Sequence, residues 1–202
     1  IGKSGKIVDA SFIEAPKQRN KREDNDLIKD GKRPEAFDEN PNVGEQKDTD
    51  ARWTKKNDET HFGYKNHTKV DAASKLIVAW EVTAASVHDS QALEGLVSED
   101  DGTLYADSAY KSDGIDKMLE QKGIENQIHE RGYRDHPLSE AQKELNRLKS
   151  RIRARVEHVY GRLAQFGAEL FRRVGIQRAI FETGLGNLVY NMDRCARLGC
   201  RA

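Results

Sequence analysis

The sequence predicts one α/β domain with a mixed sheet of five strands flanked by helices, and three observations lead to this class. The chain has 202 residues, 36% of them hydrophobic, which is long enough for one α/β core. Short apolar runs that are typical of strands recur along the chain. Their order with the helical segments is three strands, helix, strand, helix, strand and long helix.

The first predicted strand covers residues 5–13 and contains Asp9 within the run IVDASFI. Residues 14–58 then form a long excursion with 23 charged residues and three of the four prolines. Such a composition cannot supply a core of its own. A loop of this length is usually functional or mobile, and a disordered, solvated loop is the alternative.

Two further strands are predicted, and together they form a predicted β-hairpin. Residues 61–71 alternate apolar and polar side chains, residues 76–83 form the second run, and residues 72–74 supply the turn. A short helix is expected over residues 89–97, with His88 among its capping candidates.

The fourth predicted strand, residues 103–106, places Asp107 at its carboxyl end, the edge where sites gather in open α/β sheets. A helix over 112–121 and a fifth strand over 124–129 come next. The long helix begins at Ser139, where S-x-x-Q is a plausible capping box. A last helix over about 180–198 closes the domain.

Three carboxylates stand in different settings: Asp9 and Asp107 in apolar strand runs, and Glu157 on the long helix. An aspartate among apolar neighbours is costly to desolvate unless a cation balances it, so the strand positions indicate a divalent metal. Two Mg²⁺ or Mn²⁺ ions, which prefer such oxygen ligands, can activate a nucleophile and stabilise the leaving oxygen of a phosphodiester. The alternative is that each acid forms a turn, pairs with a cation or is solvated.

The long helix has an apolar stripe at three- and four-residue steps. One flank holds Arg153, Glu157 and Tyr160 at i, i+4 and i+7, so we expect these side chains to share a surface. The other flank is basic and predicts phosphate contacts, with a solvated face as the alternative. Clustered carboxylates repel one another, so without metal we expect at least one to have a raised pKa or to recruit Arg153 or a lysine.

The net charge is zero, but the charges are segregated. Residues 81–107 carry seven acidic groups and no Lys or Arg, whereas residues 143–178 carry ten Lys/Arg and three Glu. The basic block predicts a polyanionic partner, which the basic stretch 17–22 could also contact. No run approaches transmembrane length, no signal peptide opens the chain, and Cys195 and Cys200 lack the partners of a zinc site, so we expect a reducing cytoplasm.

Three separated stretches resemble the DDE transposases of the insertion-sequence 5 family, within the insertion-sequence 4/5 superfamily. They are HFGYKNHTKVDAASKLIVAWEVTAASVHDSQALEGL, YADSAY and RVEHVYGRL, and they occur in the right order. The resemblance spans nearly the whole chain, from Ile7 to about Arg194. It implies an RNase H-like fold in which Asp9, Asp107 and Glu157 are the catalytic, metal-binding triad for two Mg²⁺ or Mn²⁺ ions.

The resemblance also implies an activity: cleavage of DNA at insertion-sequence ends and joining of the freed 3′ hydroxyl to target DNA. The protein would act on double-stranded DNA as a homo-oligomer, in a bacterial cytoplasm and at the nucleoid. Arg153 matches the arginine of the superfamily's tyrosine-arginine-glutamate-lysine signature, whose tyrosine and lysine positions are Ser150 and Ala164 here. The expected DNA contacts are five arginines: Arg147, Arg151, Arg153, Arg155 and Arg162.

Two alternatives stay open, namely an RNase H-like nuclease that only hydrolyses DNA and an inactive DNA-binding remnant of a truncated transposase. Members of the family usually carry an N-terminal DNA-binding region before the first catalytic aspartate. Because this chain begins eight residues before Asp9, we expect a single catalytic domain over 1–202, without that region and with an insertion at about 14–58. His88 either lies near the site or caps a helix.

Overall fold

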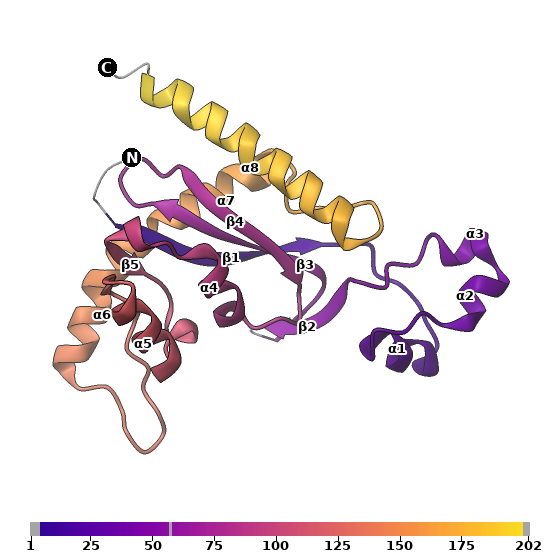
Figure 1. Cartoon of the computed structure of the whole chain (residues 1–202), viewed down its shortest axis with the longest axis horizontal. Helices are drawn as coiled ribbons and strands as arrows, with labels where there is room; N and C mark the ends of the chain where they lie inside the picture. Colours follow the sequence, from indigo (N-terminus) through magenta and orange to yellow (C-terminus); the bar gives the residue numbers. More distant parts are fainter. Residues whose placement is uncertain (1–4, 57, 200–202) are drawn as a thin grey trace.

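The structure, a computed structural model, describes residues 5–56 and 58–199, and within them it has one mixed sheet of six strands (Figure 1). The strands run in the order β2-β3-β1-β5-β6, and β4 pairs with β3. Their bounds are β1 (Lys6–Glu14), β2 (Arg52–Lys56), β3 (Glu59–Asp71), β4 (Ile77–Ala84), β5 (Thr103–Tyr105) and β6 (Glu125–Asn126). β1 is antiparallel to β3 and parallel to β5.

A mixed sheet flanked by helices confirms the predicted fold class, with one strand more than expected. β2 escaped prediction because its sequence, RWTKK, is mostly charged and shows no run of apolar residues. It forms because β3 is 13 residues long: residues 64–70 pair with β4, while residues 59–63 pair with β2. β6 has two residues rather than the expected six.

Helices cover both faces of the sheet because neighbouring residues of a strand point to opposite faces. Val8 packs into a core with α4 (Leu93–Leu96) and α5 (Asp113–Gln121). Ile7 packs into a second core with α7 (Arg155–Gln165) and α8 (Ile176–Gly199). The central strand β1 therefore lies between the two helical layers.

The predicted long helix is two helices, α6 (Glu140–Arg153) and α7, which meet at Ala154. Ser139 forms the expected capping box, since its hydroxyl accepts from the amide of Gln142 and its own amide donates to the Gln142 side chain. At the junction, the amide of Glu157 donates to the carbonyl of Ala154, three residues back. Such a bond winds the chain more tightly than an α-helix does.

Within the predicted excursion 14–58, the described residues 14–56 are folded, contrary to the expected loop. They contain α1 (Arg22–Lys29), α2 (Glu35–Glu39), α3 (Pro41–Gly44) and β2, and α1–α3 lie beyond the end of β1 (Figure 1). Ile28 and Phe37 are buried within this segment, at 6% and 4% exposure. Each anchor belongs only to an apolar pair, Leu27-Ile28 or Ala36-Phe37, and the charged residues around it hide it because no longer apolar run forms.

Asp48 ties this segment to the domain. Its buried carboxylate accepts hydrogen bonds from the Tyr64 hydroxyl of β3, at 2.7 and 2.8 Å, from the Ala51 amide at 2.9 Å and from the Gly175 amide at 3.1 Å. Burial and this carboxylate raise the pKa of Tyr64 well above its usual range. One side chain thus joins the excursion, the central sheet and the start of α8.

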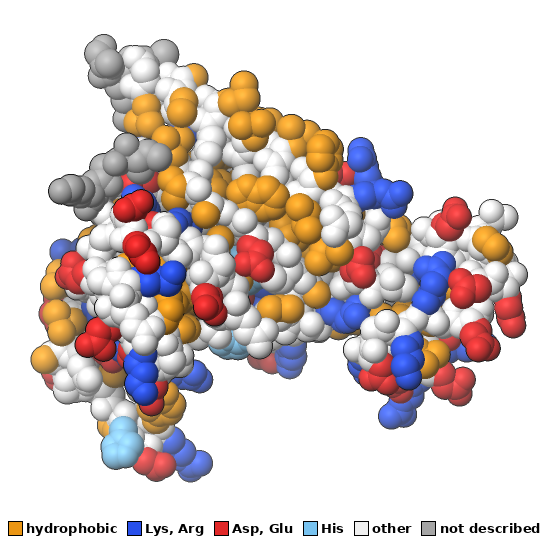
Figure 2. Space-filling view, viewed as in Figure 1, with side chains coloured by type: hydrophobic (Ala, Val, Ile, Leu, Met, Phe, Trp, Pro, Cys, Tyr) orange, Lys and Arg blue, Asp and Glu red, His pale blue; other side chains and the backbone are white. Residues whose placement is uncertain are grey.

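One side of α8 packs on the sheet, while the other exposes large apolar side chains. They gather in a stripe along the helix (Figure 2), and those that are at least half exposed are Phe181, Leu185, Leu188 and Met192. In the described part of the chain, no helix is both long enough and apolar enough to span a membrane. Cys195 is exposed, and Cys200 lies outside the described residues.

We expect Asp48→Ala to lower the free energy of unfolding by about 3 kcal/mol, because buried donors from three segments lose one charged acceptor. Urea unfolding followed by circular dichroism measures this loss. Asp26→Ala, which removes an exposed acid of α1 paired only with Lys29, should change stability by less than about 0.5 kcal/mol. Equal effects of the two substitutions would contradict the role assigned to Asp48.

Candidate active site

Asp9 and Asp107 emerge side by side because of how β1 and β5 pair. The two strands are parallel, and Ile7 lies opposite Tyr105 in the last pair of their register. Asp9 and Asp107 each follow two residues later. β5 ends at Tyr105, which leaves this edge of β1 open beside Asp9.

Arg153, the last residue of α6, is the counter-ion of this pair. Its Nη1 donates to Asp9 Oδ2 at 2.9 Å, and its charge also acts on Asp107. Asp9 Oδ1 accepts from the Ala10 amide at 2.9 Å, while Asp107 accepts from the amide and hydroxyl of Ser108. Each carboxylate is therefore held by the residue that follows it in the chain, and the charge of the Arg153 guanidinium acts on both.

The two carboxylates differ in their pKa. Burial raises the pKa of Asp9 above its ordinary value of 3.8, and the nearby charge of Asp107 adds to this rise, against the opposing effect of Arg153. Burial also acts to raise the pKa of Asp107, but hydrogen bonds from Ser108 and the charge of Arg153 outweigh it and hold that pKa below 3.8. The expected raised pKa and the expected recruitment of Arg153 are both confirmed at Asp9, with burial as the largest cause of the rise.

Glu157 does not join the two aspartates in this structure. It is exposed on α7 and lines a cavity of about 420 Å³ together with Lys75, Tyr190 and Asp193. Within residues 5–56 and 58–199, no three His, Cys, Asp or Glu side chains lie close enough to hold one metal. The i, i+4 projection assumed one continuous helix, whereas Arg153 ends α6 and Glu157 lies on α7, on the other side of the break at Ala154.

Tyr160 does lie beside Asp9, as the helix projection predicted for that flank. Its hydroxyl is 2.8 Å from the Thr68 hydroxyl, and Thr68 is the register partner of Asp9 on β3. The charge of Asp9 also contributes to raising the pKa of Tyr160, after the larger effect of burial. This contact places α7 against the sheet next to the aspartates.

The basic flank of the long helix is partly occupied by contacts within the chain. Arg162 binds both carboxylate oxygens of Asp193, at 2.9 and 3.1 Å, and Arg155 donates to the Ala72 carbonyl. Arg147 and Arg151 are both exposed. The one salt bridge that Arg147 forms within the described residues is a long contact of 3.8 Å with the exposed Glu144. Of the five expected DNA contacts, Arg147 and Arg151 are thus the ones most accessible to a ligand.

Residues near the aspartates that the sequence analysis did not assign to the site include Asp89 and Tyr110. Asp89 pairs with Lys65 at 2.7 Å, and its charge acts on Tyr110 and Tyr160, as does that of Asp9. The Tyr110 hydroxyl is buried and has no hydrogen-bond partner in the described part of the chain. The sequence signal for Asp89 was the run His88-Asp89-Ser90, in which a place near the site or a capping role was expected for His88.

His88, the first residue of that element, is an exposed helix cap. Its Nδ1 lies 2.8 Å from the Ser90 hydroxyl and accepts from the Ser90 amide at 3.3 Å. The helix that it caps is a short 3₁₀ turn, Asp89–Ala92, followed by α4. The capping alternative for His88 is therefore the one observed, while its neighbour Asp89 turns toward the site.

The sequence model of the family described as "Transposase DDE domain" matches residues 1–192. The chain belongs to this family. A curated relative, the transposase for insertion sequence element IS1106 of Neisseria meningitidis serogroup B, is 37% identical over 124 residues, which are 58% of this chain and 41% of that protein. The alignment thus spans less than half of the relative's length. No solved structure matches the chain.

A DDE transposase domain has an RNase H-like fold, and such domains typically use divalent metal ions. Asp9 and Asp107 fit such an ion: both offer hard oxygen ligands, and the buried charge of Asp9 is balanced only in part by Arg153. Glu157 does not fit in the observed position of α7. The DDE domain therefore presents two of the three expected ligands together.

With chelator present, we expect Asp9→Asn to be more stable than the unaltered DDE domain at pH 7. The fold raises the pKa of Asp9, so its contribution to stability is full below pH 3.8 and is lost as the pH rises through the folded-state pKa. The advantage of the uncharged Asn should therefore vanish on acidification toward pH 3.8.

Thermal unfolding from pH 3.5 to 8 measures this difference. His67, whose pKa burial lowers to about 4, destabilises both proteins equally as the pH falls and drops out of the comparison. Asp113→Asn, at an exposed acid of α5, serves as the control. A lower melting temperature for Asp9→Asn at pH 7 would mean that the ion pair with Arg153 outweighs the cost of burial.

Proposed function

We propose that this domain cleaves DNA at insertion-sequence ends and joins the freed 3′ hydroxyl to target DNA, with Mg²⁺ or Mn²⁺ held by Asp9 and Asp107. The observation that carries the proposal is the placement of these two acids on neighbouring parallel strands, in a chain of the DDE family: Asp9 lies within β1 and Asp107 just after β5, each two residues beyond the last pair of their register. Two such ions would supply an activated nucleophile and stabilise the leaving oxygen. A homo-oligomer on double-stranded DNA is part of the proposal.

Arg153 would change partners during this chemistry. In the structure its guanidinium compensates Asp9, although its Nε is buried and has no hydrogen-bond partner within the described residues. Asp9 and Asp107 would hold the cation, whose charge would then compensate Asp9 in place of Arg153. The planar guanidinium then becomes available to bind a phosphate of the DNA with two parallel hydrogen bonds.

The third acid of the proposed triad is Glu157, and its use requires α7 to turn about Ala154. The break between α6 and α7 lies between Arg153 and Glu157, so a change in winding there would alter the position of Glu157 relative to the aspartates. Asp89 is a competing third acid because its charge already acts on the same tyrosines as Asp9.

We expect Mn²⁺ to raise the melting temperature of the unaltered chain, because an ion that binds only the folded state stabilises it by mass action. At an ion concentration about 100 times the dissociation constant, the gain is roughly 2.7 kcal/mol. Asp107→Asn should lose most of this shift, and the control Asp113→Asn should keep it. Differential scanning calorimetry with and without chelator provides the measurement.

The roles of Glu157 and Asp89 are separated by two substitutions, Glu157→Gln and Asp89→Asn. We expect Glu157→Gln to reduce nicking of labelled element-end DNA by about a thousandfold or more, since it removes a charge that a metal needs. Its affinity for DNA should stay unchanged. Gel-resolved nicking and a binding assay run in parallel, with melting temperatures to verify folding, decide the outcome.

If Glu157→Gln nicks at the unaltered rate while a folded Asp89→Asn does not, Asp89 is the third acid instead. The products of the same gels address the nuclease alternative. Hydrolysis without joined products indicates a nuclease, and binding without cleavage by the unaltered chain indicates an inactive remnant.

A further inference from the structure

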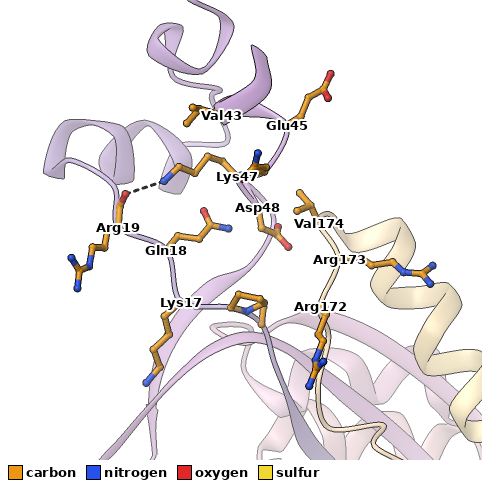
Figure 3. Close-up of a pocket in the computed structure, with 13 residues that line it drawn as sticks. Lys17, Gln18, Arg19, Val43, Glu45, Lys47, Asp48, Arg172, Arg173 and Val174 are labelled. Atoms are coloured by element: carbon orange, nitrogen blue, oxygen red, sulfur yellow. Dashed lines mark hydrogen bonds between the residues drawn. The ribbon is translucent and has the colours of Figure 1, made fainter. Parts of the chain in front are cut away.

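A cleft with a volume of about 530 Å³ opens beyond the end of β1, away from the aspartates (Figure 3). Its walls come from three segments: residues 15–19, residues 43–48 and residues 172–174. The first and third walls are joined where the Phe171 amide donates to the Glu14 carbonyl at 2.8 Å. The second and third are joined by the bond from Gly175 to Asp48.

The cleft carries an excess of positive charge. Its lining includes five cations and two acids: Lys17, Arg19, Lys47, Arg172, Arg173, Glu45 and Asp48. One cation is neutralised, since Arg173 pairs with Glu182 of α8 at 2.6 Å. In the part of the chain that the structure describes, the other four cations form no salt bridge.

Lys47 is held in place without being neutralised. Its Nζ donates to the Arg19 carbonyl and to the Asn20 side chain, both at 2.9 Å, so two uncharged acceptors fix a full positive charge. Lys17 and Arg172 extend in the same direction from opposite walls (Figure 3). Two opposite walls thus carry cations, and the Lys17 ammonium lies 5.9 Å from the centre of the Trp53 ring of β2.

Gln18, in the first wall, has a buried side-chain oxygen without a hydrogen-bond partner in the described residues. The two ends of an amide differ only in whether they donate or accept, and a half-turn exchanges them. After that half-turn, the NH₂ group of Gln18 stands where the unpaired oxygen was. That position is buried, so the exchange changes the polar group inside the wall and not the surface that a ligand meets.

We infer that this cleft binds the phosphate backbone of duplex DNA as an anchor apart from the reacting phosphate, an inference that rests on the proposed function. Uncompensated cations on two walls match a ligand that carries a row of negative charges. Ala15, at the cleft, lies six residues beyond Asp9, roughly 20 Å along an extended strand. At 3.4 Å per base pair, that distance is about six base pairs of duplex.

The test compares the unaltered chain with Lys17→Ala/Arg172→Ala and with a control of equal charge change, Lys32→Ala/Lys117→Ala, at exposed positions outside the cleft. Fluorescence anisotropy measures binding to a random-sequence duplex of about 30 base pairs from 50 to 200 mM salt. In the cleft variant, Lys17→Ala/Arg172→Ala, the loss of two phosphate contacts should make the slope of the logarithm of the binding constant against the logarithm of the salt concentration less steep by about 1.8. The control should keep the unaltered slope.

The length of the DNA locates the contact. The second set of DNAs is element-end duplexes in which the arm, the duplex on one side of the nicked phosphate, is shortened stepwise. Lys17→Ala/Arg172→Ala should bind these DNAs more weakly than the unaltered chain only when the arm exceeds about six base pairs. Nicking of duplexes with shorter arms should match the unaltered chain. A weaker affinity with every arm length would place Lys17 and Arg172 elsewhere on the DNA path and overturn the inference.

The outcome is separable from that of the proposed function. Asp107→Asn should abolish nicking and leave the salt slope intact. If it does, but the cleft variant keeps the slope of the unaltered chain, the cleft inference fails and the catalytic proposal stands. Absence of salt-dependent binding to duplex DNA by the unaltered chain would also overturn the inference.

Discussion

The carboxylate of Asp9, set in the central strand of the sheet, is the constraint that organises the site around it. A charge at that position is costly unless a cation compensates it, and α6 ends where Arg153 can do so at 2.9 Å. The helix changes direction one residue later, at Ala154, and α7 continues with Tyr160 against the register partner of Asp9. Beyond the same junction, Glu157 lines the cavity beside α8 rather than joining the aspartates.

A comparison with two other ion pairs of the sheet shows why Arg153, the counter-ion of Asp9, is suited to replacement by a metal ion. Lys69 pairs with Asp101, and Lys6 with Asp71, each at 2.9 Å and with side chains less than a tenth exposed. The side chains of Asp9 and Arg153 are 20% and 23% exposed. Solvent and ions can reach this pair, whereas opening the other two would leave a fully buried charge unpaired.

The fold class and the position of the two aspartates could be predicted because they depend on local signals. Short apolar runs marked β1 and β5, and their parallel pairing places Asp9, within β1, beside Asp107, just after the end of β5. β2 was missed because its partner strand, rather than its own sequence, stabilises it. The helices between Glu14 and β2 were missed because Ile28 and Phe37 stand in apolar pairs too short to mark an element, within a charged segment. The hydrogen bonds of Asp48 that hold this segment join residues far apart in the sequence.

Glu157 shows the limit of helical projection. An ideal helix over residues 139–166 puts Arg153, Glu157 and Tyr160 on one surface, and two of the three do lie beside Asp9. The three-residue bond at Ala154 has no signature in the sequence, since alanine favours an uninterrupted helix. What stabilises the break is tertiary: Arg153 is held by Asp9 and Arg155 by the Ala72 carbonyl, one residue on either side of Ala154. A metal that displaced Arg153 from Asp9 would release one of these two restraints, which couples the position of Glu157 to the occupancy of the aspartates.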